Sequence, residues 1–129
     1  MQKSYALDTS ILIVHYYKRN LSYIVEIGFI NLHTLSEIFY VICRAEGLDN
    51  AVKYVKELLK MMKIVPSNEL VYIAGQFKCK YRISLADAWT LATAKVKKVP
   101  ALFAVKEKEI IDIFDELKRE VEIEFLYAD

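Results

Sequence analysis

The chain contains 129 residues, which is the length of one domain rather than two. Its 18 lysine and arginine residues nearly balance its 17 aspartate and glutamate residues, so the net charge of +1 gives no general attraction for nucleic acid. A hydrophobic content of 55% excludes disordered and low-complexity chains, and two cysteines are too few for a disulfide scaffold.

The same sequence carries no apolar run long enough for a transmembrane helix. The most apolar stretch, from Leu21 to Cys43, is interrupted by Glu26, His33 and Glu37. The first residues contain neither an apolar signal region nor a cleavage site. We therefore expect a soluble, cytoplasmic protein that folds as a single domain over residues 1–129.

Strand-like and helix-like segments alternate in the first half of the chain. Thr34 and Glu37 have the spacing of a capping box, which predicts that a helix begins at Thr34. The expected elements are a strand over 4–8, a helix over 11–18, a strand over 27–32, a helix from Thr34, and a helix from Asp49 to about Met62.

The alternation continues in the second half. Ser84 and Asp87 repeat the capping-box spacing before an alanine-rich stretch, which predicts a helix through about Lys97. The other expected elements are strands over 64–66, 101–105 and 121–125, and helices from Ser67 or Asn68 to Lys80 and over 108–117.

This alternation predicts an α/β fold, a three-layer α/β/α sandwich around a mainly parallel central sheet. Ligands of such sheets bind at the carboxyl ends of the strands, near the point where the strand order reverses. That edge is therefore where we look for functional side chains.

Four acidic residues fall at junctions between predicted elements. Asp8 ends the first strand, Glu37 and Asp87 lie in the first turns of two helices, and Glu107 follows the strand over 101–105. Each has an ordinary interpretation, because carboxylates cap helices and Glu107 belongs to a charged surface run. Together, however, they would line one edge of the sheet.

The motifs around these acids resemble those of the PIN-domain family, and most closely its VapC branch, the toxin half of VapBC toxin–antitoxin systems. The matching segments are Asp8-Thr9-Ser10 after the first strand, Leu35-Ser36-Glu37-Ile38, and Ser84-Leu85-Ala86-Asp87-Ala88 before the alanine-rich helix. The fourth motif of the family aligns with residues 103–110, where Val105 replaces Thr and Glu107 and Glu109 replace two Asp.

The resemblance implies a PIN-like domain acting as a metal-dependent endoribonuclease with Mg²⁺ or Mn²⁺ as cofactor. Asp8, Glu37 and Asp87 match the three most diagnostic acids, and Glu107 keeps the charge of the fourth with a longer reach. It also implies an RNA substrate, a homodimer and a cognate antitoxin that covers the site. The changes at Val105 and Glu107 predict weakened activity or a shifted metal preference.

The chemistry of clustered carboxylates agrees with this interpretation. Four carboxylates within several ångströms repel one another, and a divalent cation removes that cost. All-oxygen ligands favour Mg²⁺ or Mn²⁺. We expect Asp8, Asp87 and Glu107 to bind metal, Glu37 to bind metal or orient the attacking water, and Ser10 to position Asp8 or a metal-bound water.

An RNA substrate would also need local positive charge near the acids. The candidates lie before the helix of Asp87 or beside Glu107, and the alternative for each is an ordinary solvated surface residue. They are Lys78, Lys80, Arg82, Lys106 and Lys108.

Two other hypotheses stay open at this point. The chain could be a non-catalytic PIN-like module that binds RNA or protein, because its fourth motif has changed. It could instead be a receiver-like domain that is phosphorylated on an aspartate, although Asp8 lacks the second acid that receivers present after the first strand.

Overall fold

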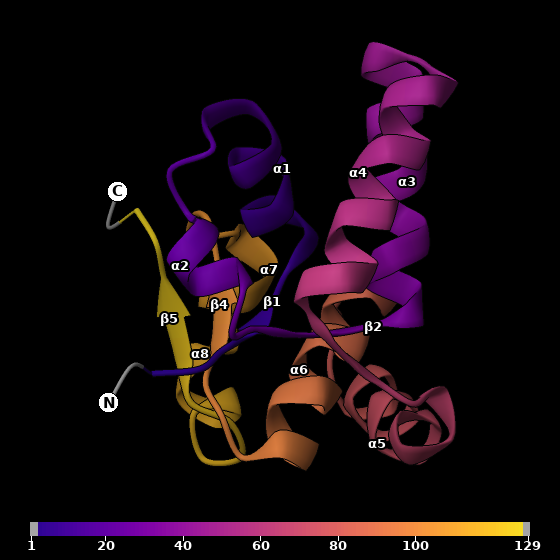
Figure 1. Ribbon diagram of the computed structural model, residues 1–129. Helices are drawn as coiled ribbons and strands as arrows, with labels where there is room; N and C mark the ends of the chain where they lie inside the picture. The colour runs from indigo at the N-terminus through magenta and orange to yellow at the C-terminus, as the bar shows by residue number, and fades with distance from the viewer. Residues whose placement is uncertain (1–2, 128–129) are drawn as a thin grey trace.

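The computed structural model describes residues 3–127. In this part of the chain, five parallel strands form one sheet in the order β3-β2-β1-β4-β5 (Figure 1). Figure 1 shows helices on both sides of this sheet, which confirms the predicted α/β class. None of the helices in the described part of the chain is both long and apolar enough to cross a membrane.

The first half of the chain supplies three strands and four helices. Strands of two or three residues are shorter than the sequence pattern predicts, because only part of each apolar run pairs with its neighbour. The elements are β1 (Ala6–Leu7), α1 (Thr9–Lys18), α2 (Ser22–Val25), β2 (Phe29–Asn31), α3 (Leu32–Glu46), α4 (Leu48–Met61) and β3 (Lys63–Val65).

The second half completes the sheet and adds the remaining helices. The elements are α5 (Ser67–Lys80), α6 (Leu85–Lys97), β4 (Ala101–Phe103), α7 (Lys108–Ile111), α8 (Phe114–Leu117) and β5 (Ile123–Phe125).

Two hydrophobic cores lie on opposite faces of the sheet, because neighbouring residues of a strand point in opposite directions. Ala6 and Phe103 belong to the core under α5 to α8, whereas Leu7 and Leu102 belong to the core under α1 to α4. All four side chains are buried. The sheet is thus the middle layer of the three-layer sandwich.

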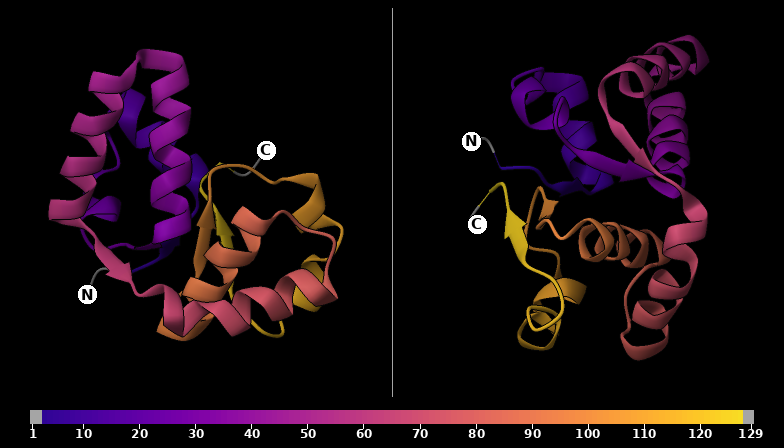
Figure 2. Two further views of the ribbon diagram at one scale, coloured as in Figure 1. Left: turned by 90° about the vertical axis from the view of Figure 1, so that its right-hand side faces the viewer. Right: turned by 60° about the horizontal axis from the view of Figure 1, so that its bottom comes forward.

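Helices α3 and α4 form a long antiparallel hairpin that extends past the sheet (Figures 1 and 2). The chain reverses at Gly47, whose φ of 93° lies in the region that favours glycine. Gly47 is therefore the residue before α4, and Asp49 lies in its first turn. The helix therefore begins one residue before the predicted start at Asp49, because the turn at Gly47 ends one helix and starts the next.

Helix α3 begins two residues before the predicted start at Thr34. Asn31 is its N-cap, and the Asn31 side-chain oxygen accepts a hydrogen bond of 2.8 Å from the backbone N–H of Thr34. The Asn31 amide nitrogen donates to the carbonyl of Trp89 (3.2 Å) and to Oγ1 of Thr93 (2.9 Å). Tertiary contacts with α6 thus fix the start of α3, and Glu37 lies in its second turn.

The predicted helix over 108–117 is interrupted and forms two short helices, α7 and α8. The backbone leaves the helical conformation at Ile113, where φ is −122° and ψ is 17°. The ring of Phe114 lies 6.2 Å from the ring of Phe125 in β5. Packing against the edge strand therefore accompanies a break that local sequence preference does not indicate.

A buried hydrogen-bonded pair joins α1 to α4. Nδ1 of His15 lies 2.8 Å from the Tyr54 hydroxyl, which donates to the carbonyl of Leu12 at 2.9 Å. Because that hydroxyl proton is directed at Leu12, His15 is assigned as the neutral tautomer that carries its proton on Nδ1. Burial lowers the pKa of His15, which favours the neutral form.

Replacing Tyr54 with phenylalanine is expected to lower the free energy of unfolding by about 1–3 kcal/mol, because two buried polar groups lose their partner. Urea denaturation followed by circular dichroism measures the change. Tyr72→Phe is the matched control, since Tyr72 is 82% exposed. Equal stability of the two variants would show that the buried pair contributes nothing.

Candidate metal centre

The acidic residues gather at the carboxyl edge of the sheet, where β1 and β4 lie side by side. Strand β1 has β2 on one side and β4 on the other, so the strand order reverses beside it. Asp8 directly follows β1, and Glu107 lies four residues after β4. The site is thus at the position predicted from the general behaviour of parallel sheets.

Asp8 is held at the junction between β1 and α1. It is the N-cap of α1, and its Oδ2 accepts hydrogen bonds from the backbone N–H (3.0 Å) and the hydroxyl (2.7 Å) of Ser10. The Ser10 oxygen in turn accepts a hydrogen bond of 2.9 Å from the backbone N–H of Ala104. Ser10 therefore connects Asp8 to the end of β4 and fixes the direction of its carboxylate.

Asp87 enters the same site from the first turn of α6. Oγ of Ser84 caps this helix by accepting a hydrogen bond of 3.0 Å from the backbone N–H of Asp87, as the capping-box spacing predicts. The Asp87 side chain is buried, and its Oδ2 has no hydrogen-bond partner among the described residues. A buried carboxylate oxygen without a partner is costly, so a proton or a bound cation would stabilise it.

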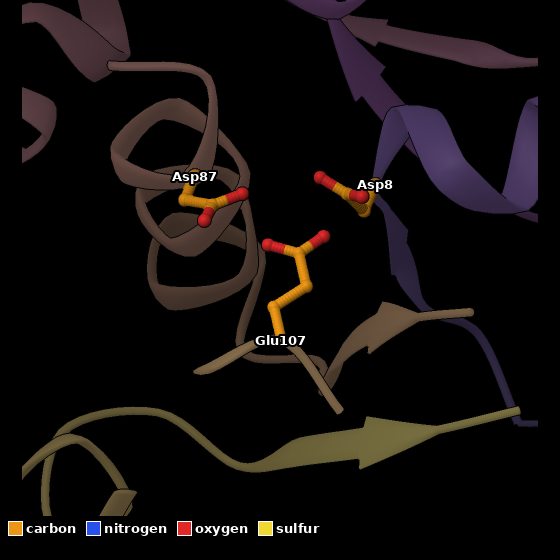
Figure 3. Close-up of side chains that lie close together, drawn as sticks. All are labelled: Asp8, Asp87 and Glu107. Atoms are coloured by element: carbon orange, nitrogen blue, oxygen red, sulfur yellow. The ribbon is translucent and has the colours of Figure 1, made fainter. Parts of the chain in front are cut away.

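Glu107 completes the cluster from the connection between β4 and α7, where it is the N-cap of α7. Figure 3 shows its carboxyl group pointing toward those of Asp8 and Asp87. One carboxylate oxygen from each of the three residues lies within 4.8 Å of the other two. The longer side chain of glutamate therefore places a carboxylate in the cluster.

Glu37 lies in the same cleft but outside this group of three. It projects from α3, and its carboxylate accepts a hydrogen bond from the hydroxyl of Thr9. Thr9 is buried beside Asp8 and was not predicted to have a role. The sequence feature that could have indicated a role for Thr9 is its position between Asp8 and Ser10 in the first motif.

The acids surround a cleft with a volume of about 260 Å³. Three apolar side chains, Ile13, Val41 and Ala86, share its wall with the polar groups. Its lining consists of Asp8, Thr9, Ser10, Ile13, Glu37, Val41, Ser84, Ala86, Asp87 and Glu107.

Electrostatics within the cluster disfavour three simultaneous negative charges. Burial raises the pKa of Asp8, and the Ser10 hydrogen bonds offset part of that rise. Burial and then the neighbouring acids raise the pKa of Asp87. Burial and the charge of Asp8 also raise the pKa of Glu107. Without a cation, the cluster therefore retains protons above the usual range for carboxylic acids.

A fifth acid, Glu109, borders the cluster, although no role was predicted for it. Its Oε1 accepts a hydrogen bond of 3.3 Å from the backbone N–H of Ser84. Interaction with Asp87 lowers the pKa of Glu109, whereas the pKa of Asp87 is raised, so Glu109 is the stronger acid of the two. The sequence feature that could have indicated a role for Glu109 is its alignment with the second acid of the fourth motif.

These donor atoms fit a hard divalent cation. Asp8, Asp87 and Glu107 offer only carboxylate oxygens, the ligand type that Mg²⁺ and Mn²⁺ prefer. A bound cation would also supply the missing partner of the buried Asp87 oxygen and remove the repulsion among the three acids.

Comparison with known proteins agrees with this architecture. The sequence model of the PIN domain matches residues 5–123. No curated protein matches the chain in sequence. Three solved structures resemble it in fold: chains from the DNA-bound VapBC complex of Salmonella typhimurium, from a toxin–antitoxin complex of Klebsiella pneumoniae, and from VapBC2 of Rickettsia felis bound to a promoter DNA fragment.

The agreement extends over nearly the whole chain in each case. The Salmonella structure has a TM-score of 0.74 at 12% identity and covers 98% of this chain and 100% of its own. The Klebsiella structure has a TM-score of 0.67 at 19% identity, with coverage of 95% and 98%. The Rickettsia structure has a TM-score of 0.65 at 15% identity, with coverage of 92% and 96%.

The fold and the acidic cluster place this chain among α/β proteins that carry an acidic site at the carboxyl edge of a parallel sheet. This chain belongs to the PIN domain family, as its match over residues 5–123 shows. The receiver-like alternative is set aside, because the family match covers the segments that carry all four acidic motifs.

Proposed function

We propose that this protein is a metal-dependent endoribonuclease and the toxin of a VapBC-type toxin–antitoxin pair. The observation that carries the proposal is the acidic cluster: one carboxylate oxygen each from Asp8, Asp87 and Glu107 lies within 4.8 Å of the other two. In addition, the buried Oδ2 of Asp87 has no hydrogen-bond partner among the described residues. The family match and the likeness to toxin–antitoxin structures support the same function.

In this proposal, the acidic residues of the cleft and the hydroxyl groups of Thr9 and Ser10 have complementary roles. Asp8, Asp87 and Glu107 hold Mg²⁺ or Mn²⁺, and Ser10 positions Asp8. Thr9 holds the Glu37 carboxylate toward the cleft, where Glu37 orients the attacking water or adds a ligand. A divalent cation there supplies Lewis acidity, which stabilises charge on the phosphate and makes water more acidic.

Two protein partners belong to the same proposal. The likeness to chains from VapBC and toxin–antitoxin complexes supports a cognate antitoxin as a partner of this chain. A second copy of the chain would cover part of the exposed apolar surface, since aromatic side chains are enriched at such interfaces. The exposed aromatic side chains are Tyr17, Tyr23, Tyr40, Tyr72 and Tyr127.

The direct test is cleavage of a mixed-sequence single-stranded RNA pool by the purified protein. Reactions with Mn²⁺, Mg²⁺ and EDTA are compared, and Asp87→Asn prepared identically is the control for contaminating nucleases. Metal-dependent cleavage that Asp87→Asn lacks is the expected result. Absence of cleavage by either protein would favour the non-catalytic module, whose support is the replacement of a hydroxyl by Val105 in the fourth motif.

Ser10→Ala is expected to lower the cleavage rate about 10-fold, because groups that orient metal ligands typically contribute 10- to 100-fold. The substitution removes the hydroxyl that joins Asp8 to Ala104 but keeps the backbone N–H bond to Asp8. Initial rates measured over a Mn²⁺ series should show a higher metal requirement. An unchanged metal requirement would mean that Ser10 does not position Asp8.

A further inference from the structure

RNA approaching this cleft meets a concentrated negative charge. Asp8, Glu37, Asp87 and Glu107 line the cleft, and Glu109 borders it. One divalent cation neutralises two of these charges at most, and the net charge of +1 provides no general attraction for phosphate. Binding of a phosphodiester chain therefore requires positive side chains at the mouth of the cleft.

Three of the five predicted basic residues are engaged within the protein. Lys78 donates a hydrogen bond of 2.6 Å to a carbonyl in the connection between α5 and α6. Lys80 donates to both oxygens of Glu120, at 3.1 and 3.2 Å. Lys108 lies 2.8 Å from a carboxylate oxygen of Asp112, one turn along the chain. Lys78 and Lys80 in particular have structural partners that RNA would have to displace.

Arg82 and Lys106 are different. Both are exposed, and neither has a hydrogen-bond or ion-pair partner within residues 3–127. Arg82 lies two residues before Ser84, and Lys106 directly precedes Glu107, and both of these neighbours line the cleft. The hydrogen bond from the Ser84 backbone to Glu109 joins the two connections. The two exposed cations thus lie on neighbouring connections, each next to a residue that lines the cleft.

The backbone on both sides is firmly held. Next to Arg82, Ile83 is 2% exposed and its carbonyl accepts the Lys78 hydrogen bond. On the other side, the backbone N–H of Ala104 donates to Ser10, and the Ala104 carbonyl accepts a hydrogen bond of 2.9 Å from the backbone N–H of Tyr127. The two exposed side chains therefore project from connections whose neighbouring backbone is hydrogen-bonded.

We infer that Arg82 and Lys106 bind the backbone phosphates of single-stranded RNA beside the acidic cluster. This inference rests on the proposed nuclease function, which it extends by naming the residues that hold the substrate. The contacts are with phosphate, so they supply affinity and register without reading the base sequence.

The test measures binding rather than cleavage. Arg82→Gln, Lys106→Gln and the double variant are made in the Asp87→Asn chain, and binding of a fluorescein-labelled mixed-sequence 12-nucleotide RNA is followed by anisotropy over a NaCl series. Each lost phosphate contact should reduce the slope of log affinity against log salt by about 0.7, and the double variant by about 1.4. Arg82→Lys keeps the charge and should restore the slope.

Lys80→Gln and Lys98→Gln are matched controls, because they remove the same charge from a paired residue and from the far end of α6. They should leave the slope unchanged. A double variant with the slope of these controls, or a chain that shows no salt-dependent RNA binding, would overturn the inference. If the Arg82 and Lys106 variants reduce the salt slope but the wild type does not cleave RNA, the binding role of the two residues stands. The nuclease function would then be contradicted.

Discussion

Asp8→Asn is expected to lower metal-dependent RNA cleavage about 10³-fold, because it removes a charged ligand at the centre of the cluster. Asparagine caps helices as well as aspartate does, so α1 should keep its start and the fold should persist. Initial rates with labelled single-stranded RNA at saturating Mn²⁺ measure the effect, and thermal denaturation checks the fold.

Asp115→Asn is the matched control, since it makes the same chemical change on a side chain that is 88% exposed in α8. Its cleavage rate should equal that of the wild type. If Asp8→Asn kept more than about a tenth of the wild-type rate, the loss would be smaller than ligand removal normally causes, and the acidic cluster would not be the catalytic centre.

Asp87→Asn is expected to stabilise the metal-free protein by about 2 kcal/mol and to raise its Tm by roughly 5 °C. The wild type must either bury a charge beside Asp8 and Glu107 or hold a proton on Asp87, and the amide avoids both costs. Thermal denaturation in EDTA at pH 8 measures the change. Asp115→Asn should leave the Tm nearly unchanged.

The direction of the pH effect follows from the raised pKa of Asp87. A carboxyl group with a raised pKa in the folded state favours folding below its ordinary value of 3.8, and this contribution is lost as the pH rises toward the folded-state pKa. The stability difference between Asp87→Asn and the wild type should therefore be larger at pH 8 than at pH 5.

Adding Mn²⁺ should reverse the order of the two proteins. A cation that binds only the folded state raises stability by RT ln(1 + [L]/Kd), and the wild type has the complete set of three acids. The Tm of the wild type should rise with Mn²⁺ concentration, whereas that of Asp87→Asn should change little. Equal shifts in both proteins would mean that the cation binds elsewhere.

The sequence predicted the layers of this fold well because its patterns are local and repeated. Apolar runs alternate with helical segments, and Ser84 with Asp87 gives a capping pattern that the structure contains. The predicted start of α3 at Thr34 was wrong for a physical reason. Asn31 caps the helix, and its amide group also binds Trp89 and Thr93, which are about 60 residues away in sequence. Such contacts leave no local pattern.

The main acids of the candidate metal centre could be predicted from the sequence, but the residues that support them could not. The positions of Asp8, Asp87 and Glu107 at the ends of elements indicated one edge of the sheet, and the structure brings their oxygens together. The hydrogen bond from Thr9 to Glu37 depends on how closely α1 approaches α3, which spacing does not determine. The position of Glu109 beside Asp87 likewise depends on the path of the connection after β4.

The order of the acids along the chain has a consequence for protein synthesis. Asp8 and Glu37 leave the ribosome before Glu107, and β4, which precedes Glu107, is made after both of them. A nascent chain that lacks this strand cannot bring the three carboxylates together. Any activity that depends on the cluster therefore requires that β4 has been made and has paired with β1.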